Sequence, residues 1–206
     1  KSIDPENKFL KIDTRIQPNL SRLFLEDVDV VIIHNPMGIS KESIKDLDKF
    51  LLEGGGVIWF QGDYIEGQYD SELFSKIGFP KIDMLVKSGQ GMFSTNISSE
   101  SSDVLQEIRV RDISKEMPEV FKYAKTYIGP KTKIHLKLNN NDPLLMEFGR
   151  GSGSIFYFSS LLDLRWNDLP MRGIVVPLLF RLIILSGTDE INTSAVLVDE
   201  SKWISI

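Results

Sequence analysis

Side chains capable of chemistry stand directly after three apolar runs of the sequence, "VDVVII", "GVIWF" and "SIFYF". In chain order they are His34, Asn35, Gln61, Asp63, Ser159, Ser160 and Asp163. In open α/β sheets, ligands bind outside the carboxyl ends of the strands. If the three runs are neighbouring strands, these polar groups converge on one edge and form a candidate binding cleft. The alternative is that they cap helices and satisfy the backbone of loops.

A hydrolytic triad can be written from this set, with Ser159 or Ser160 as the nucleophile. His34 would then be the base and Asp63 its partner. Only His34 and His135 could act as a general base near neutral pH. Neither serine lies in the Gly-x-Ser-x-Gly pattern of a nucleophile elbow, so the triad is not favoured. His135 lies in the alternating segment "TKIHLKLN" and is interpreted as an ordinary residue on one face of a strand.

Metal and phosphate sites are not favoured either. His34, Asp63 and Asp163 could bind a metal only if the fold made them converge, which their spacing does not indicate. The glycine-rich "GRGSGS" (149–154) lacks the Lys-Ser/Thr that completes a phosphate-binding loop, and it precedes a strand. It therefore predicts a tight hairpin turn. We expect no metal and no cofactor.

The first two apolar runs predict a β-α-β unit. Residues 28–34 and 56–61 are continuous and rich in β-branched side chains, which is typical of parallel strands covered on both faces. Between them, residues 40–53 have a helical apolar pattern, with Ser40 as N-cap and Gly54 just past the end. The connection should be a right-handed crossover.

Further elements are expected on both sides of this unit. They are a strand at 8–13, a short helical link at 20–25, a helix at 70–78, a buried strand that follows the glycine-rich turn within 149–160, and a last helix at about 173–186. Trp166 should fill the space between that strand and the last helix. The side chains that we expect to face the sheet from this helix are Ile174, Leu178, Leu182 and Leu185, with Arg181 reaching solvent.

Residues from about 80 to 148 change to short alternating segments and predict an antiparallel β insert. Strands are expected at 81–87, 107–112, 121–128, 132–139 and 143–149. The sequence "NNND" (139–142) predicts a hairpin turn, and the Ser-rich residues 94–103 predict an exposed loop.

Composition sets limits on function. The 206 residues, 42% hydrophobic and 26% charged, are typical of one globular domain. A net charge of -5 without a clustered basic segment argues against nucleic acid as a partner. The absence of cysteine excludes disulfides, thiolate metal sites and a cysteine nucleophile.

The ends of the sequence predict a piece of a longer protein. It begins at Lys1 and stops abruptly at "SKWISI", so we expect targeting and membrane segments outside this window. The most apolar stretch, residues 174–187, is shorter than the roughly 20 residues that cross a bilayer and contains Arg181, which predicts a buried helix.

The order of these elements resembles the class I glutamine amidotransferase-like domain. It is most similar to the version in bacterial membrane proteins of the Bacteroides aerotolerance (BatA-like) type, through "WNDLPMRGIVVPLLFRL" following "GSIFYFSSLLD". The resemblance covers most of residues 8–187. It implies an α/β domain over residues 1–187, with a flavodoxin-like, mainly parallel sheet flanked by helices and the antiparallel insert. Residues 188–206 would be a C-terminal extension or the start of a following segment.

The resemblance also locates lost catalytic groups. In active amidotransferases the strand matching residues 57–61 ends in the catalytic cysteine, and a later strand ends in a His-Pro-Glu segment. Here those positions fall at Gln61 or Gly62 and at Ser159 to Leu161. A glutamine amide is neither nucleophile nor base, and serine cannot accept a proton near pH 7. We expect Gln61 to tie the end of its strand to neighbouring loops, towards Asn35 or Ser159.

The resemblance therefore implies a non-catalytic domain of a membrane-anchored envelope protein. It would lie on the periplasmic side of a bacterial inner membrane and contact other envelope proteins or other domains of the same chain. The alternative is a small-ligand-binding or hydrolytic domain that uses the cleft at the carboxyl ends of the strands.

Overall fold

A computed structural model places the helices and strands along the chain. It describes residues 10–16, 25–36, 39–64, 71–89, 91–98, 103–106, 108, 112–187 and 193–199. The strands are β1 (Leu10–Ile16), β2 (Val30–His34), β3 (Gly56–Phe60), β4 (Lys81–Lys87), β5 (Phe93–Ile97), β6 (Glu119–Val120), β7 (Lys122–Tyr127), β8 (Lys133–Leu138), β9 (Pro143–Arg150), β10 (Gly153–Phe158) and β11 (Thr193–Asp199). The helices are α1 (Lys41–Leu52), α2 (Ser71–Ile77), α3 (Asp103–Gln106), α4 (Ile113–Glu116), the 3-10 helix η1 (Leu169–Met171) and α5 (Val175–Ser186).

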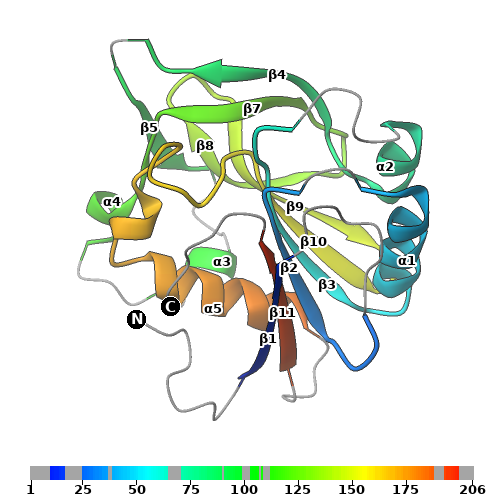
Figure 1. Cartoon of the computed structure of the whole chain (residues 1–206). Coiled ribbons are helices and arrows are strands. Elements are labelled where there is room, and N and C mark those ends of the chain that lie inside the picture. Colours follow the sequence, from blue (N-terminus) through cyan, green and yellow to red (C-terminus); the bar gives the residue numbers. More distant parts are fainter. Residues whose placement is uncertain are drawn as a thin grey trace.

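The centre of the fold is a nine-stranded sheet in the order β1-β11-β2-β3-β10-β9-β8-β5-β6. Strands β1, β11, β2, β3 and β10 pair in parallel, and the strands from β10 to β6 pair antiparallel. Helices α1 and α2 lie on one face of the sheet and α5 on the other (Figure 1). This α/β architecture, with an antiparallel extension of a parallel sheet, confirms the predicted fold class.

Burial alternates along the central strands. Val31 and Ile33 of β2 belong to the core beneath α1 and α2, whereas Val30 and Ile32 belong to the core beneath α5. The same period of two divides β3 and β10 between the two cores. Because each fully buried aliphatic side chain contributes about 1.5–3 kcal/mol, both cores contribute substantially to stability.

Local sequence explains α1 well. The Ser40 hydroxyl accepts a hydrogen bond from the backbone N–H of Ser43 at 3.0 Å, which caps the first turn as predicted. Gly54, with φ of 104°, turns the chain after the helix. The buried apolar side chains of the helix are Ile44, Leu47, Phe50 and Leu51.

Helix α5 covers the opposite face, and its first turn accommodates Pro177. Ile174, Leu178 and Leu182 are buried as predicted, and Ile183 is buried with them. Leu185 is only partly buried, and Arg181 is half-buried rather than reaching freely into solvent. Trp166 is buried in the same core, as expected. Among the described helices, none combines the length and apolarity needed to cross a bilayer.

The β-rich insert divides into two parts. Strands β5, β6, β8 and β9 extend the main sheet, whereas β4 and β7 form a separate two-stranded ribbon (Figure 1). The predicted turns are confirmed: Asn141, with φ of 69°, lies between β8 and β9, and Gly151, with φ of 63°, lies between β9 and β10. A Cβ at Gly151 would stand 2.7 Å from Leu52 Cα, so the hairpin closes against the end of α1.

Two predictions about the insert need correction. The Ser-rich segment 94–103 was expected to be a loop, but residues 94–97 lie in β5, where Thr95 is buried and pairs with Leu138 of β8. Of the strand expected at 107–112, the described Ile108 and Asp112 are not in a strand, and the other residues lie outside the described part. The helical link expected at 20–25 is likewise outside it, except for Leu25.

Strand β11 was not predicted. It lies between β1 and β2 and is parallel to both, so the sheet continues past residue 187 to Asp199. Strand β1 is at Leu10–Ile16, slightly later than the predicted 8–13. Its neighbour β11 comes from the far end of the chain, and a pairing of this kind has no local sequence signal.

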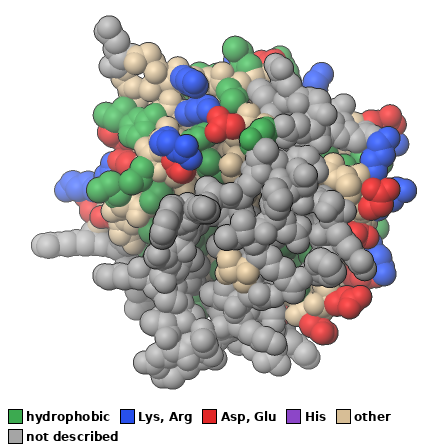
Figure 2. Space-filling model, viewed as in Figure 1, with side chains coloured by type: hydrophobic (Ala, Val, Ile, Leu, Met, Phe, Trp, Pro, Cys, Tyr) green, Lys and Arg blue, Asp and Glu red, His purple; other side chains and the backbone are tan. Residues whose placement is uncertain are grey.

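The described surface around α1 and α2 carries both signs of charge. Acidic and basic side chains are interspersed along this side of the molecule (Figure 2). Within it, Lys49 faces Glu53 at 3.8 Å and Lys76 faces Glu72 at 2.8 Å, both one helical turn apart. Such exposed pairs give solubility and little stability.

Replacing Leu178 by alanine should lower the free energy of unfolding by about 2–5 kcal/mol, because the side chain is buried and its loss leaves a cavity. The matched control is Ile184→Ala in the same helix, where 46% of the side chain is exposed and the change should stay within about 0.5 kcal/mol. Denaturant unfolding measures both. Equal losses would contradict the assignment of the buried face.

Candidate functional site

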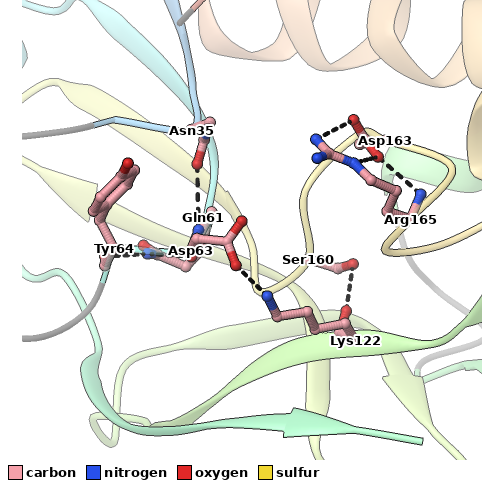
Figure 3. Close-up of polar contacts among 9 residues, drawn as sticks. Asn35, Gln61, Asp63, Tyr64, Lys122, Ser160, Asp163 and Arg165 are labelled. Carbon is pink, nitrogen blue, oxygen red and sulfur yellow. Dashed lines mark hydrogen bonds and ion pairs between the residues drawn. The ribbon is translucent and has the colours of Figure 1, made fainter. Parts of the chain in front are cut away.

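The carboxyl ends of β2, β3 and β10 meet at one edge of the sheet. The backbone N–H of Asn35 donates to Phe60 O at 3.1 Å, and that of Gln61 donates to Phe158 O at 3.0 Å. These bonds join the three strands just where their apolar runs stop. The predicted polar residues therefore do follow three neighbouring parallel strands, as Figure 3 shows for most of them.

Gln61 is buried, with 1% of its surface exposed, and its amide is fully hydrogen-bonded. Its Oε1 accepts from Trp59 Nε1 and from the hydroxyl of Tyr157, both at 3.1 Å. Its Nε2 donates to Gly62 O at 3.2 Å and to Tyr64 O at 3.0 Å. Since a glutamine amide has two donors and two acceptor lone pairs, no capacity is left for a ligand. The amide ties β3 to β10 through Tyr157. It also ties β3 to its own following loop through Tyr64 (Figure 3), rather than to Asn35 or Ser159.

The turn after Gln61 requires glycine. A Cβ at Gly62 would stand 1.7 Å from Asn35 Oδ1 and 2.9 Å from Asn35 Cα. Asn35 itself has φ of 49°, a left-handed conformation that asparagine tolerates better than most residues. Its Oδ1 accepts from the N–H of Asp63 at 3.2 Å. The two turns after β2 and β3 are thus packed against each other.

Asp63 is paired with a residue from the insert. Its carboxylate forms an ion pair with Lys122 Nζ, at the start of β7 (Figure 3). The same ammonium group lies 4.2 Å from the ring centroid of Trp166, a cation–π contact. Lys122 is 13% exposed and Asp63 49% exposed, so the pair is formed at the rim of the edge. It links the turn after β3 to the separate ribbon.

The hydroxyl groups of the two serines after β10 bond to the backbone of other strands. Ser159 Oγ donates to Pro143 O at 2.8 Å, and Ser160 Oγ donates to Lys122 O at 2.9 Å. Ser160 Oγ also accepts from Asn167 Nδ2 at 2.8 Å. Both serines are buried, with their hydrogens directed at carbonyl oxygens. Neither is positioned as a nucleophile for His34.

His34 is buried at the end of β2, with Nε2 3.3 Å from Leu162 O. Because a carbonyl only accepts, this contact assigns the proton to Nε2. Nearby, the Asp163 carboxylate accepts from Arg165 Nε at 2.8 Å and from Arg165 Nη2 at 2.9 Å (Figure 3). Hydrogen bonding by this guanidinium lowers the pKa of Asp163, which is therefore ionised at neutral pH.

The edge thus brings the predicted residues together, and their described hydrogen bonds are made mostly to the strand ends and the following turns. Among the described residues, no group of three or more acidic, histidine or cysteine side chains could hold a metal ion. The sequence did not predict three further residues at this edge, Lys122, Asn167 and Arg165. Of these, Arg165 lies two residues from its partner and could have been paired locally, whereas Lys122 lies 59 residues from Asp63.

His135 lies in a strand, β8, as predicted, but it is more than an ordinary face residue. It is fully buried on β8, and its Nε2 is 2.7 Å from Glu147 Oε2 on the neighbouring β9. Its ring also lies 5.8 Å from that of Phe156, between centroids. A buried imidazole paired with a carboxylate satisfies the usual requirement for burying a polar group.

No protein-family model and no curated protein matches this chain. Solved structures do match. The cytoplasmic proteins STM3548 and STM1381 of Salmonella typhimurium give TM-scores of 0.67 and 0.66 at 16% and 15% identity. The first match covers 79% of this chain and 73% of that one, and the second covers 85% and 78%.

A ThuA-like protein of Bacteroides uniformis gives a TM-score of 0.58 at 10% identity, covering 79% of this chain and 72% of that one. At these identities the matches show the fold alone. The resemblance to class I glutamine amidotransferase-like domains is confirmed at this level: the chain has the class I amidotransferase-like, ThuA-like fold, and it lacks the catalytic cysteine of the amidotransferases.

Proposed function

We propose that the chain is a non-catalytic, amidotransferase-like domain of a membrane-anchored envelope protein, which contacts other envelope proteins or other domains of its own chain. The observation that supports a non-catalytic domain is the bonding of the Gln61 amide. The resemblance implies that the nucleophile of active amidotransferases would fall at Gln61 or Gly62, and all four hydrogen bonds of the Gln61 amide are made within the protein. A catalytic nucleophile must instead be free to attack and be held by a base.

The interaction role is supported by the ribbon of β4 and β7. Met84 of β4 is 53% exposed and Tyr127 of β7 is 58% exposed, followed by Ile128 at 41%. Methionine and aromatic side chains are enriched where proteins bind one another. The ribbon also lies outside the main sheet, so a partner could contact it without disturbing the two cores (Figure 1).

The membrane and periplasmic parts of the proposal rest on the resemblance of "WNDLPMRGIVVPLLFRL" to aerotolerance-type proteins. In the structure this segment includes η1 and the first two turns of α5, which pack against one face of the sheet. Its role within the domain is packing, so any membrane anchor would be a segment other than α5.

Gln61→Ala should lower the free energy of unfolding, because the Trp59 indole and the Tyr157 hydroxyl would each lose a buried acceptor. Each orphaned donor costs about 1–3 kcal/mol. The control is Asn96→Ala, which removes an exposed amide on β5 and should be close to neutral. Denaturant unfolding of the two variants makes the comparison, and an unchanged Gln61→Ala midpoint would argue against a structural amide.

The purified wild type should hydrolyse neither glutamine nor simple esters, and Gln61→Cys should not acquire either activity. The cysteine would have no histidine base, because Ser159 and Ser160 occupy the region where the family places it. Glutaminase and esterase assays on the wild type, Gln61→Ala and Gln61→Cys test this. Wild-type turnover that disappears in Gln61→Ala would favour the hydrolytic alternative instead.

In cells, the full-length protein that carries this domain should fractionate with the inner membrane, with the domain on the periplasmic side. Reporter fusions within the domain determine on which side of the inner membrane it lies. One reporter should be active only in the periplasm and the other only in the cytoplasm. Activity of the cytoplasmic reporter alone would overturn the localisation, and recovery in the soluble fraction would overturn the anchoring.

A further inference from the structure

A second candidate site, an open and shallow depression, lies away from the edge cluster, between the described part of the loop that joins β4 to β5 and the turn that joins β8 to β9. Its volume is about 400 Å³, within the range of small-molecule sites. Its lining residues are Ser88, Gly89, Gly91, Met92, Phe93, Asn139 and Asn140. None of them belongs to the edge at β2, β3 and β10.

Free hydrogen-bonding groups face this site. Asn139 is exposed, and within the described part of the chain its side-chain amide makes no hydrogen bond, although its backbone N–H donates to Ser94 O at 2.9 Å. The Ser88 hydroxyl is also unbonded among the described residues. An amide presents donors and an acceptor side by side, which matches a pair of adjacent hydroxyl groups.

The wall beside Asn139 is held rigidly. Asn140 Nδ2 donates to the Tyr123 hydroxyl at 2.8 Å, and Asn140 Oδ1 accepts from the N–H of Asp142 at 3.1 Å. The Tyr123 hydroxyl in turn donates to Asp142 Oδ2 at 2.5 Å. Burial, together with the bond to Asp142, raises the pKa of Tyr123 to about 12, so this donor keeps its proton at physiological pH. The turn is therefore preorganised for binding.

The remaining wall is apolar. Phe93 is half-buried and packs edge-on against Tyr123, with ring centroids 5.2 Å apart. Met92 beside it is 53% exposed. A fixed aromatic ring next to a free amide can contact a ligand that has one apolar face and a polar rim.

Among the described residues, the lining contains no ionisable side chain. A carboxylate or phosphate ligand would lose hydration without gaining a counter-charge, which disfavours charged ligands. We propose that this site binds a neutral sugar, with adjacent hydroxyls bonded to the Asn139 amide and the C–H face of the ring packed on Phe93. The proposal stands apart from the function proposed above, since it uses none of the same residues.

The test is saturation-transfer NMR and calorimetry on the whole chain with uncharged methyl glycosides of glucose, galactose and mannose. Glucuronate and glucose 6-phosphate serve as charged probes. At least one uncharged glycoside should bind, and the charged analogues should bind more weakly. Absence of any signal from the three glycosides at their highest soluble concentrations, or tighter binding of the charged probes, would overturn the proposal.

Gly91→Trp blocks the site in a way that the fold should tolerate. Apart from its chain neighbours, no described atom lies within 4 Å of a Cβ at Gly91, and its φ is outside the left-handed range. Gly129→Trp is the matched control, in an open loop where the nearest atom to a Cβ is 4.0 Å away. Gly91→Trp should abolish binding and Gly129→Trp should preserve it, with equal unfolding midpoints. Asn139→Ala should weaken binding by about tenfold through the loss of its hydrogen bonds. Undiminished binding by Gly91→Trp would place the sugar elsewhere and refute the assignment.

Discussion

The central parallel strands must bury both of their faces, and the rest of the structure depends on this constraint. Val30 to Ile33, Gly56 to Phe60 and the apolar part of β10 leave almost no room for polar side chains within the sheet. A polar group inside such a strand would need a buried partner or would cost several kcal/mol, about 2–7 for an amide or hydroxyl. Polar chemistry is therefore confined to the strand ends, where His34, Gln61 and Ser159 stand.

At these strand ends, the polar groups bond to the protein itself. The Gln61 amide, the two serines and the Asn35 side chain all bond to strand ends or to the turns that follow them. The close approach of Gly62 to Asn35 leaves no space between the first two turns. The described polar groups at this edge of the sheet thus act as structural cross-links between the strand ends and the turns that follow them.

The antiparallel half of the sheet can present side chains at the surface, whereas the parallel half is covered on both faces. The antiparallel half does not need helices on every part of both faces, so its loops and the ribbon of β4 and β7 can present side chains to the outside. Both proposed contact regions, the exposed ribbon and the pocket beside Asn139, come from this insert. The Asp63–Lys122 pair joins it to the parallel half and fixes the ribbon near the edge.

Much of this architecture is predictable from the sequence because its signals are local. Continuous apolar runs predicted β2, β3 and β10, and the Ser40 cap and Gly54 predicted the bounds of α1. The glycine turn before β10 and the asparagine turn before β9 were predicted correctly, and the absence of cysteine excluded the amidotransferase nucleophile.

Only the tertiary structure decided the remaining features of the fold and the site, because these features depend on residues far apart in the chain. A Ser-rich composition argued for a loop at residues 94–97, but pairing with β8 makes them a strand. Strand β11 enters the sheet between β1 and β2, which no local pattern foretells. His135 has an unremarkable alternating context, yet the bulge in β8 and the neighbouring Glu147 place it in a buried pair. The sequence by itself determined which residues stand at the strand ends; only folding decided that the Gln61 amide bonds Trp59 and Tyr157, since that choice needs β3 and β10 side by side.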